Sequence, residues 1–103
     1  MALDQAKIDF SQNKMVLKGV FSFETVLPIY ESGISFIQKQ TVSLSPLEID
    51  LSQLTKSDSS GLAVFLGWMR AAKQKNITLH FSNVPKYLLD VARLCGIENI
   101  LPI

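Results

Sequence analysis

The sequence predicts an α/β fold with a mixed, mostly parallel β-sheet. Two strand patterns near the N-terminus, separated by three polar residues, indicate an antiparallel hairpin, because so short a turn cannot carry a parallel crossover. After the hairpin, helix and strand patterns alternate, which is typical of parallel strands joined by right-handed crossover helices. About three helices are therefore expected to pack on the sheet. The 103 residues suit a single domain spanning 1–103.

The individual elements follow from the spacing of apolar residues and from turn signals. Two breaks fall inside the first helical pattern: Pro28 fits in its opening turn, and Gly33 marks a kink or a close contact. Its apolar positions are Val26, Leu27, Tyr30, Ile34 and Ile37. The expected elements are strands at 8–10 and 15–21, a helix at 22–40 capped by Ser22 or Thr25, a polar linker at 41–46, a strand at 47–51, a helix at 59–74 with Asn76 as its C-cap, a strand at 77–81, a helix that starts at 82–85 and ends at Gly96, and a last edge strand within 97–103.

The apolar residues of the helix expected at 59–74 divide into a stripe and a flank. Trp68 lies on the flank, and this position is compatible equally with partial exposure and with burial of its side chain. An exposed Trp is a common anchor of protein interfaces. The predicted core stripe is Leu62, Phe65, Leu66 and Met69, with Val64 and Trp68 to one side.

A polar corner joins the strand at 47–51 to this helix. Residues 57–62, Ser-Asp-Ser-Ser-Gly-Leu, place three hydroxyls and a carboxylate where the helix should begin. Asp and Ser favour such a position because their oxygens accept hydrogen bonds from the free N–H groups of the first turn. The corner therefore has two interpretations: a helix cap alone, or a surface serine that is modified or pressed against a partner.

Composition argues against several classes of function. The formal net charge is +1 and no Lys/Arg run stands out, so nucleic-acid binding is not expected. One cysteine and one histidine exclude a disulfide within the chain and are too few to build a metal site readily. No Gly-rich phosphate loop or dinucleotide motif occurs, so no cofactor is expected. No apolar run reaches about 18 residues and no signal-peptide pattern opens the sequence, so we expect a soluble, cytoplasmic protein.

Catalysis is not expected either. A serine nucleophile needs a base, and the histidine, His80, lies in a predicted strand between two apolar residues. Cys95 and Leu94, near the end of the last helix, are interpreted as packed apolar residues. A small enzyme that uses Ser59 is the weakest hypothesis, because no base, oxyanion site or cofactor motif accompanies that serine.

Three consecutive features resemble the STAS domain: the strand Leu-Glu-Ile-Asp-Leu at 47–51, the Ser-Asp-Ser-Ser-Gly-Leu corner at 57–62, and the long helix after it. That family includes the anti-sigma factor antagonists of Gram-positive bacteria and the cytoplasmic tails of sulfate transporters. The resemblance covers nearly the whole chain. It implies a STAS-like fold, which agrees with the order of elements expected from the pattern.

Two further segments are similar to one branch of that family, the MlaB subunits of Mla phospholipid ABC transporters. They are Val-Leu-Pro-Ile-Tyr-Glu at 26–31 and Ala-Arg-Leu-Cys-Gly-Ile at 92–97. The second segment is followed by Leu-Pro-Ile at 101–103. The resemblance implies a non-catalytic cytoplasmic subunit that binds and regulates or stabilises an MlaF-like ATPase. Through that ATPase it would be peripheral to the inner membrane, act with a permease complex and help maintain outer-membrane lipid asymmetry.

The resemblance also implies a binding surface. In MlaB-like proteins a hydroxyl residue at the start of the second helix contacts the ATPase, and the matching position here is Ser59. The Ser59-Ser60 pair is nearer to the phosphorylated antagonists, so an anti-sigma factor antagonist switched by phosphorylation of Ser59 is the alternative. Small residues at helical spacing would let a partner approach closely. The expected surface comprises Ser57, Ser59, Ser60, Ala63, Gly67 and Trp68, with Tyr30 and Glu31 of the first helix at its rim.

Overall fold

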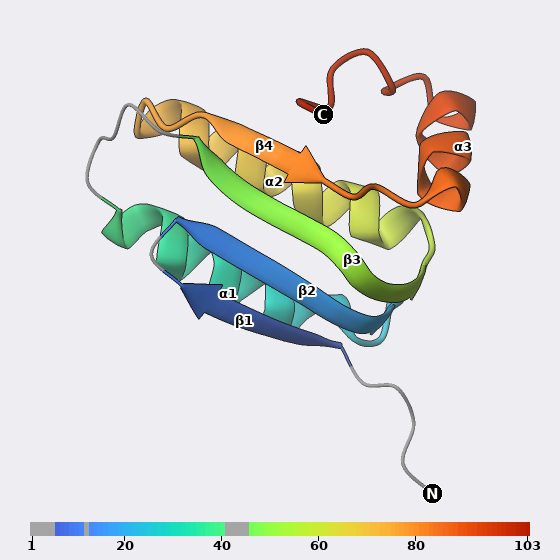
Figure 1. Ribbon diagram of the computed structural model, residues 1–103, viewed down its shortest axis with the longest axis horizontal. Helices are drawn as coiled ribbons and strands as arrows, with labels where there is room; N and C mark the ends of the chain where they lie inside the picture. Colours follow the sequence, from blue (N-terminus) through green and yellow to red (C-terminus); the bar gives the residue numbers. More distant parts are fainter. Residues whose placement is uncertain (1–5, 12, 41–45) are drawn as a thin grey trace, which may run out of the picture.

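The computed structural model describes residues 6–11, 13–40 and 46–103, and within them the chain forms four strands and three helices (Figure 1). Of the predicted linker at 41–46, only Pro46 lies among the described residues. The elements are, in order, β1 (Lys7–Ser11), β2 (Lys14–Phe21), α1 (Val26–Lys39), β3 (Leu47–Ser57), α2 (Ser59–Gln74), β4 (Leu79–Ser82) and α3 (Lys86–Leu94).

The sheet has the topology predicted from the sequence. Its strand order is β1-β2-β3-β4; β1 pairs antiparallel with β2, whereas β3 pairs in parallel with both β2 and β4. In the hairpin, Ile8 lies opposite Leu17 and Phe10 opposite Met15, so these four side chains share one face. The three parallel strands all end at the same edge of the sheet, where the connections to α1, α2 and α3 begin (Figure 1).

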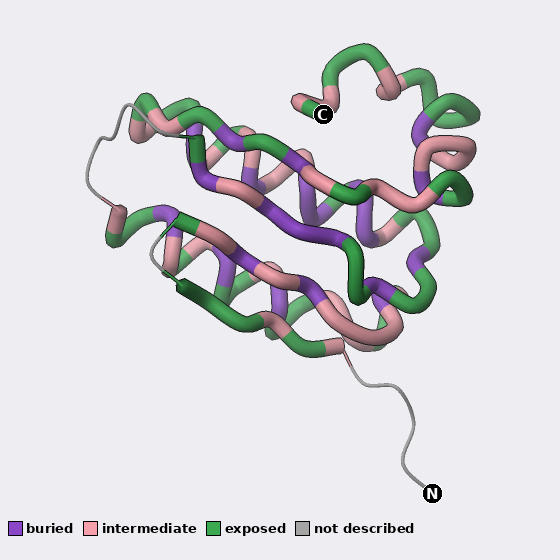
Figure 2. The backbone as a smooth tube through the Cα atoms, in the orientation of Figure 1, coloured by how far each residue is buried: buried purple, intermediate pink, exposed green. Residues whose placement is uncertain are grey.

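Two layers enclose the core. Helices α1 and α2 both lie on one face of the sheet, and α3 lies beside the start of α2 (Figure 1). Buried positions follow the sides of the strands and helices that face each other (Figure 2). The largest fully buried side chains are Met15, Leu17, Phe21, Ile37, Ile49, Leu51, Phe65, Trp68, Phe81 and Leu88.

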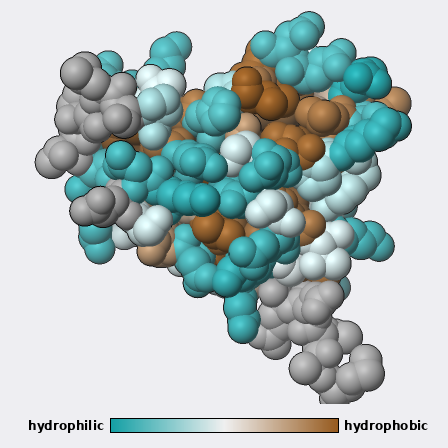
Figure 3. All heavy atoms as spheres, viewed as in Figure 1, coloured by the Kyte–Doolittle hydropathy of each residue, from teal (hydrophilic) through white to brown (hydrophobic). Residues whose placement is uncertain are grey.

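The other face of the sheet is mostly hydrophilic (Figure 3), and ion pairs cross it. The Lys14 ammonium of β2 lies 3.3 Å from a carboxylate oxygen of Asp50 and 3.9 Å from one of Glu48, both on β3. From the β4 side, the Ser82 hydroxyl donates to Glu48 at 2.6 Å and the Asn83 amide donates to Asp50 at 3.0 Å. These contacts link three strands, and they explain why this face needs no helix to cover it.

Helix α1 begins at Val26, so Thr25, the second of the two predicted caps, occupies the N-cap position, and the residues before Val26 form a turn. The Thr25 hydroxyl accepts the N–H of Ser22 at 2.9 Å and donates to the carbonyl of Val20 at 2.9 Å. This side chain ties the turn to the end of β2 instead of capping the helix. Pro28 lies in the first turn of α1, as predicted.

Helices α2 and α3 end in the same way. Asn76 and Gly96 follow the last helical residues with φ angles of 58° and 73°, which glycine and asparagine tolerate best. In α2 the N–H of Ile77 then donates to the carbonyl of Ala72 at 2.8 Å, and the equivalent bond closes α3 at 2.9 Å. This arrangement is a Schellman motif. It confirms Gly96 as the end of the last helix and places Asn76 one residue beyond the C-cap, Lys75.

Two strand predictions were wrong. Strand β3 continues to Ser57 instead of ending at Leu51, because the polar stretch after Leu51 pairs with β2 through two register shifts and keeps Leu54 buried. The last strand, predicted within 97–103, does not form among those described residues. The carbonyl of Pro102 accepts the N–H of Phe81 at 2.8 Å, but proline has no N–H to continue a ladder.

The buried faces of α2 and α3 also differ from the prediction. Leu66 and Met69, predicted as core, are only half-buried, because the buried face of α2 is turned toward α1. On α3, Leu94 is 88% exposed because it lies off the stripe of the buried Leu88 and Ala92, and Cys95 is exposed as the C-cap residue at the end of the helix. The buried residues of α2 are Gly61, Leu62, Val64, Phe65, Trp68 and Ala72.

Candidate functional site

The corner between β3 and α2 lies at the edge where the parallel strands end. Asp58 is the N-cap of α2: its carboxylate accepts the N–H of Ser60 at 2.8 Å and also the Ser60 hydroxyl. The N–H of Asp58 donates to the carbonyl of Phe21 at 3.2 Å, which joins the corner to the end of β2. The cap interpretation of this corner is therefore confirmed, with Asp58 as the residue that supplies it.

Ser57 and Gly61 close the corner from the inside. Ser57 is 6% exposed, and its hydroxyl donates to the carbonyl of Asp58 at 2.9 Å. A Cβ at Gly61 would collide with that hydroxyl, so any other residue there would have to displace the Ser57 side chain from this position. Ser57 thus faces the interior, and its predicted contact with a partner is wrong for the chain in this conformation.

The outer side of the corner carries a negative charge. The hydrogen bond from the Ser60 hydroxyl lowers the pKa of Asp58 and outweighs burial, which raises it; the Ser60 N–H lowers it further. Asp58 is therefore ionised at neutral pH, at the end of the helix where the dipole favours an anion. Ser59, the first residue of α2, is exposed next to this carboxylate.

Two glycines let α1 and α2 approach closely. Gly33 of α1 is buried against the indole of Trp68, with no room for a Cβ, so its predicted close contact is confirmed. Gly67 of α2 faces the ring of Tyr30, and a Cβ there would lie 2.5 Å from the Tyr30 Cε1. The Trp68 Nε1–H donates to the carbonyl of Tyr30 at 3.1 Å. In each helix, therefore, a glycine packs against an aromatic side chain of the other helix: Gly33 against Trp68, and Gly67 against Tyr30.

Two residues predicted to contact a partner belong to this internal contact. Trp68 is 0% exposed, so its predicted role as an exposed anchor is wrong. The flank on which it lies faces α1, and docking of that helix buries it. The space beside Gly67, predicted to admit a partner, is filled by Tyr30 from the same chain.

An apolar groove of about 650 Å³ opens beside this contact, at the starts of α1 and α2. Phe23 is 86% exposed and Leu27 is 64% exposed, although both side chains are large and apolar. Exposed apolar residues gathered around a concavity are typical of interaction sites. The groove is lined by Phe23, Glu24, Val26, Leu27, Tyr30, Ser60, Ala63 and Val64.

The structure brings three of the eight residues of the predicted binding surface to this groove. Tyr30, Ser60 and Ala63 line it directly. Ser59 and Glu31 are exposed and adjoin lining residues in the sequence. Because Ser60 lines the groove and donates hydrogen bonds to Asp58, the groove and the outer side of the corner form one continuous candidate surface, which we call the corner groove.

Phe23 and Leu27, the most exposed apolar residues of the corner groove, were not among the binding residues predicted from the sequence. Helical spacing assigns Leu27 to the core face, but the buried stripe of α1 runs through Ile29, Gly33 and Ile37. Phe23 lies in the turn before α1, where no periodicity applies. One signal could have identified Phe23: it lies between two polar residues in a turn, so it belongs to no apolar helix or strand face that would bury it.

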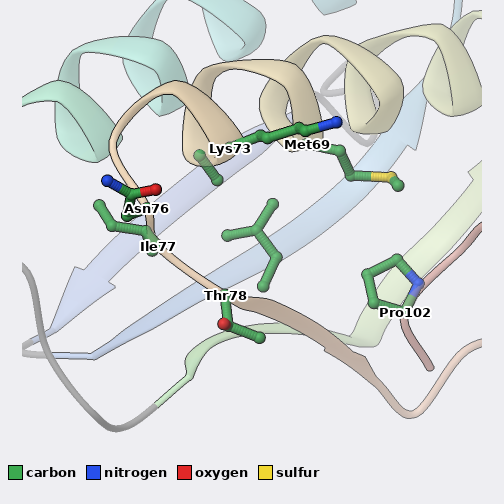
Figure 4. Close-up of a pocket in the computed structure, with 8 residues that line it drawn as sticks. Met69, Lys73, Asn76, Ile77, Thr78 and Pro102 are labelled. Atoms are coloured by element: carbon green, nitrogen blue, oxygen red, sulfur yellow. The ribbon is translucent and has the colours of Figure 1, made fainter.

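A second hollow, of about 430 Å³, lies between α2, the segment before β4 and the C-terminal segment (Figure 4). Met69 and Lys73 come from α2, Ile77 and Thr78 from the segment before β4, and Pro102 from the C-terminal segment. The residues that line it include no carboxylate, histidine or cysteine, so it offers no acid–base pair.

Other chemistry is sparse in the described part of the chain. There, no group of three or more His, Cys, Asp or Glu side chains is placed to hold a metal ion. His80 is exposed on β4, in register with Glu48 on the polar face of the sheet, whereas Ser59 begins a helix on the opposite face. Among the described helices, none has the length and apolar character needed to cross a membrane.

The sequence matches the family described as "Mlab, STAS domain" over residues 5–102. It is 31% identical over 85 residues to the intermembrane phospholipid transport system binding protein MlaB of Haemophilus influenzae, an alignment that covers 82% of this chain and 81% of that protein.

Solved structures agree with this match. A chain of the Acinetobacter MlaFEDB complex in the ATP-bound Vtrans2 conformation superposes with a TM-score of 0.78 at 33% identity, covering 91% of this chain and 96% of that one. A chain of the same complex in the Vtrans1 conformation gives 0.71 at 35% identity, with 84% and 87% covered. The anti-sigma factor antagonist SpoIIAA shares the fold, with a TM-score of 0.71 at 17% identity over 93% of this chain and 84% of its own. The match over nearly the whole sequence, together with the mixed sheet and the capped corner, shows that this chain belongs to the MlaB-type STAS domain family.

Proposed function

We propose that this protein is a non-catalytic STAS subunit of an Mla-type phospholipid ABC transporter, and that it binds and regulates or stabilises the MlaF-like ATPase. The observation that carries the proposal is the corner groove, where large apolar side chains are exposed together around a concavity. The similarity to chains of the MlaFEDB complex in two conformations supports the same kind of partner.

The groove would recognise its partner mainly through Phe23 and Leu27. Burying an exposed side chain of this size is worth about 1.5–3 kcal/mol, from which the cost of ordering the interface is subtracted. Ser59, Ser60 and Glu24 would supply a polar rim around this apolar centre. A standard interface buries about 800 Å² on each partner, which two adjacent helix starts can provide.

The proposed role is binding rather than catalysis. Asp58 adjoins Ser59, but its carboxylate is already engaged by the N–H and hydroxyl of Ser60. The chain would act in the cytoplasm, peripheral to the inner membrane through the ATPase and the permease complex. Its contribution to outer-membrane lipid asymmetry would be indirect, by way of the ATPase.

Binding to the MlaF-like ATPase from the same host tests the proposal. Leu27→Asp and Ser59→Arg each place a charge in or beside the groove, so we expect affinity to fall more than about tenfold. Stability should change by less than about 1 kcal/mol, because both residues are exposed. Leu94→Asp is the matched control: it changes a helical leucine on α3 that is even more exposed, 88% against 64% for Leu27, and should bind like wild type.

The possible failures are distinguishable. Normal binding by both Leu27→Asp and Ser59→Arg would show that the interface lies elsewhere. No binding by the wild-type chain would refute the proposed partner.

An anti-sigma factor antagonist switched by phosphorylation of Ser59 is the second candidate. The observation that favours it is the exposed Ser59 hydroxyl at the first residue of α2, where the helix dipole favours a phosphate. Against it, Asp58 already accepts the Ser60 N–H, so a phosphate on Ser59 would lie beside an ionised carboxylate. For this reason we favour the transporter subunit.

A further inference from the structure

We infer that Gly67 is a positioning residue of the corner groove: the space left by its missing side chain seats the Tyr30 ring, which forms part of the groove wall. The inference rests on the function proposed for the groove. Gly67 itself is not a lining residue, whereas Tyr30 is. A substitution at Gly67 would therefore alter the groove through Tyr30 and not by touching the partner.

The backbone of Tyr30 is held from the inside. Its carbonyl accepts the Trp68 Nε1–H at 3.1 Å. That indole is fully buried, lies against Gly33 and packs beside Phe65, with ring centroids 5.9 Å apart. Because the indole cannot shift without opening the core, the Tyr30 backbone is fixed and only its side chain is free to adjust.

The outer end of the Tyr30 ring lies over Gly67. A Cβ at Gly67 would lie 2.5 Å from Cε1, 3.1 Å from the hydroxyl oxygen and 3.2 Å from Cζ of Tyr30. Carbon atoms in contact prefer about 3.5–4.0 Å. A methyl group at position 67 must therefore push the ring aside. Since Tyr30 is half-buried, its ring can move into the groove or toward solvent without disturbing the core.

Gly33 provides the matched control, because it is the other glycine of the same helix pair. A methyl group there meets the buried indole of Trp68, which has nowhere to go. Both glycines lie within helices, where alanine is intrinsically favoured over glycine. Gly33→Ala should therefore lower the Tm, whereas Gly67→Ala should leave it unchanged or raise it.

NMR of the free chain tests, without any partner, whether the Tyr30 ring packs on Gly67. In wild type, NMR should show nuclear Overhauser contacts between the Tyr30 ring protons and the Gly67 α protons. In Gly67→Ala the ring resonances should shift while the Tm does not fall. Unchanged ring resonances in Gly67→Ala, or a fall in Tm as large as that of Gly33→Ala, would overturn the inference.

Binding to the MlaF-like ATPase tests the consequence for the groove. Gly67→Ala should weaken binding about tenfold or more in the wild-type background. In a Tyr30→Leu background it should cause no further loss, since no ring remains to be displaced. Equal losses in both backgrounds would mean that Gly67 contacts the partner directly, against the inference. If wild type itself does not bind, the proposed function fails. The measurements on the free chain still decide whether Gly67 positions the Tyr30 ring.

Discussion

Single residues at the start of α2 divide their roles by direction. Asp58 points outward and caps the helix, while Ser57 points inward and braces the backbone. Ser59, between the cap and the first turn, is exposed and is left for interactions outside the fold. Residues 57–59 thus combine a structural carboxylate, that of Asp58, with a surface hydroxyl, that of Ser59.

This division predicts unequal effects of two neighbouring alanines. Asp58→Ala removes the acceptor for the Ser60 N–H and should reduce the free energy of unfolding by about 1 kcal/mol. Ser59→Ala should change it by less than about 0.5 kcal/mol, as expected for an exposed residue that does not cap. Urea unfolding of the two variants beside wild type is the measurement. A larger loss in Ser59→Ala than in Asp58→Ala would contradict this assignment.

Among the elements, β3 is the one that ties the sheet together, and Asp50 is its polar centre. Asp50 is 7% exposed and accepts hydrogen bonds from the Asn83 amide at 3.0 Å and from the Ser52 N–H at 2.9 Å. Burial raises the pKa of Asp50, but these bonds and the Lys14 ammonium outweigh it and hold the pKa at about 2. Asn83 has a φ of 56° in the turn that leads to α3, so Asp50 also fixes this turn.

The lowered pKa of Asp50 predicts a pH dependence of stability. Because the folded-state pKa, about 2, lies below the ordinary value of 3.8, the charged form stabilises the fold above pH 3.8. That contribution, on the order of 1–2 kcal/mol, is lost as pH falls from 3.8 toward 2. In urea unfolding between pH 5 and pH 2, Asp50→Asn should be less stable than wild type at pH 5 and should lose less on acidification.

Asp9 serves as the control for this titration. It forms an exposed ion pair with Lys18, and such pairs contribute little to stability. Asp9→Asn should therefore follow the wild-type dependence on pH. A wild-type slope in Asp50→Asn would show that other carboxylates cause the acid loss.

At the scale of the whole molecule, the two faces of the sheet have different tasks. One face carries α1 and α2 and the core, and the starts of these helices form the corner groove. The other is closed by polar contacts between strands. The candidate surface is therefore placed at the edge where the parallel strands end, which is where α/β sheets commonly present their functional loops.

The two candidate functions differ in whether Ser59 is phosphorylated in the native host. We expect the protein purified from its native host to have its unmodified mass, because Asp58 makes the site beside it unfavourable for a phosphate. Intact-mass spectrometry checks this, with Ser59→Ala as the reference. A substantial species heavier by one phosphate, absent in Ser59→Ala, would favour the antagonist role instead.

Local sequence was sufficient for most elements of the fold. The bounds of α2, the presence of a side-chain cap at the corner and the end of α3 at Gly96 were predicted correctly. Each depends on apolar periodicity or on hydrogen bonds between residues a few positions apart. Such signals are complete within a short window of the chain, so no knowledge of the tertiary structure is needed to interpret them.

Only the tertiary structure decided which side chains remain at the surface. In the sequence pattern Trp68 lies on a helix flank and Leu27 on the apolar face of its helix, yet docking of α1 on α2 buries Trp68 fully and leaves Leu27 exposed. The contacts that decide this, Trp68 on Gly33 and Tyr30 on Gly67, join residues more than thirty positions apart. Periodicity gives the direction of a side chain relative to its own helix, but burial depends on where the second helix lies. For that reason the serines at the corner were apparent from the sequence, and the apolar groove beside them was not.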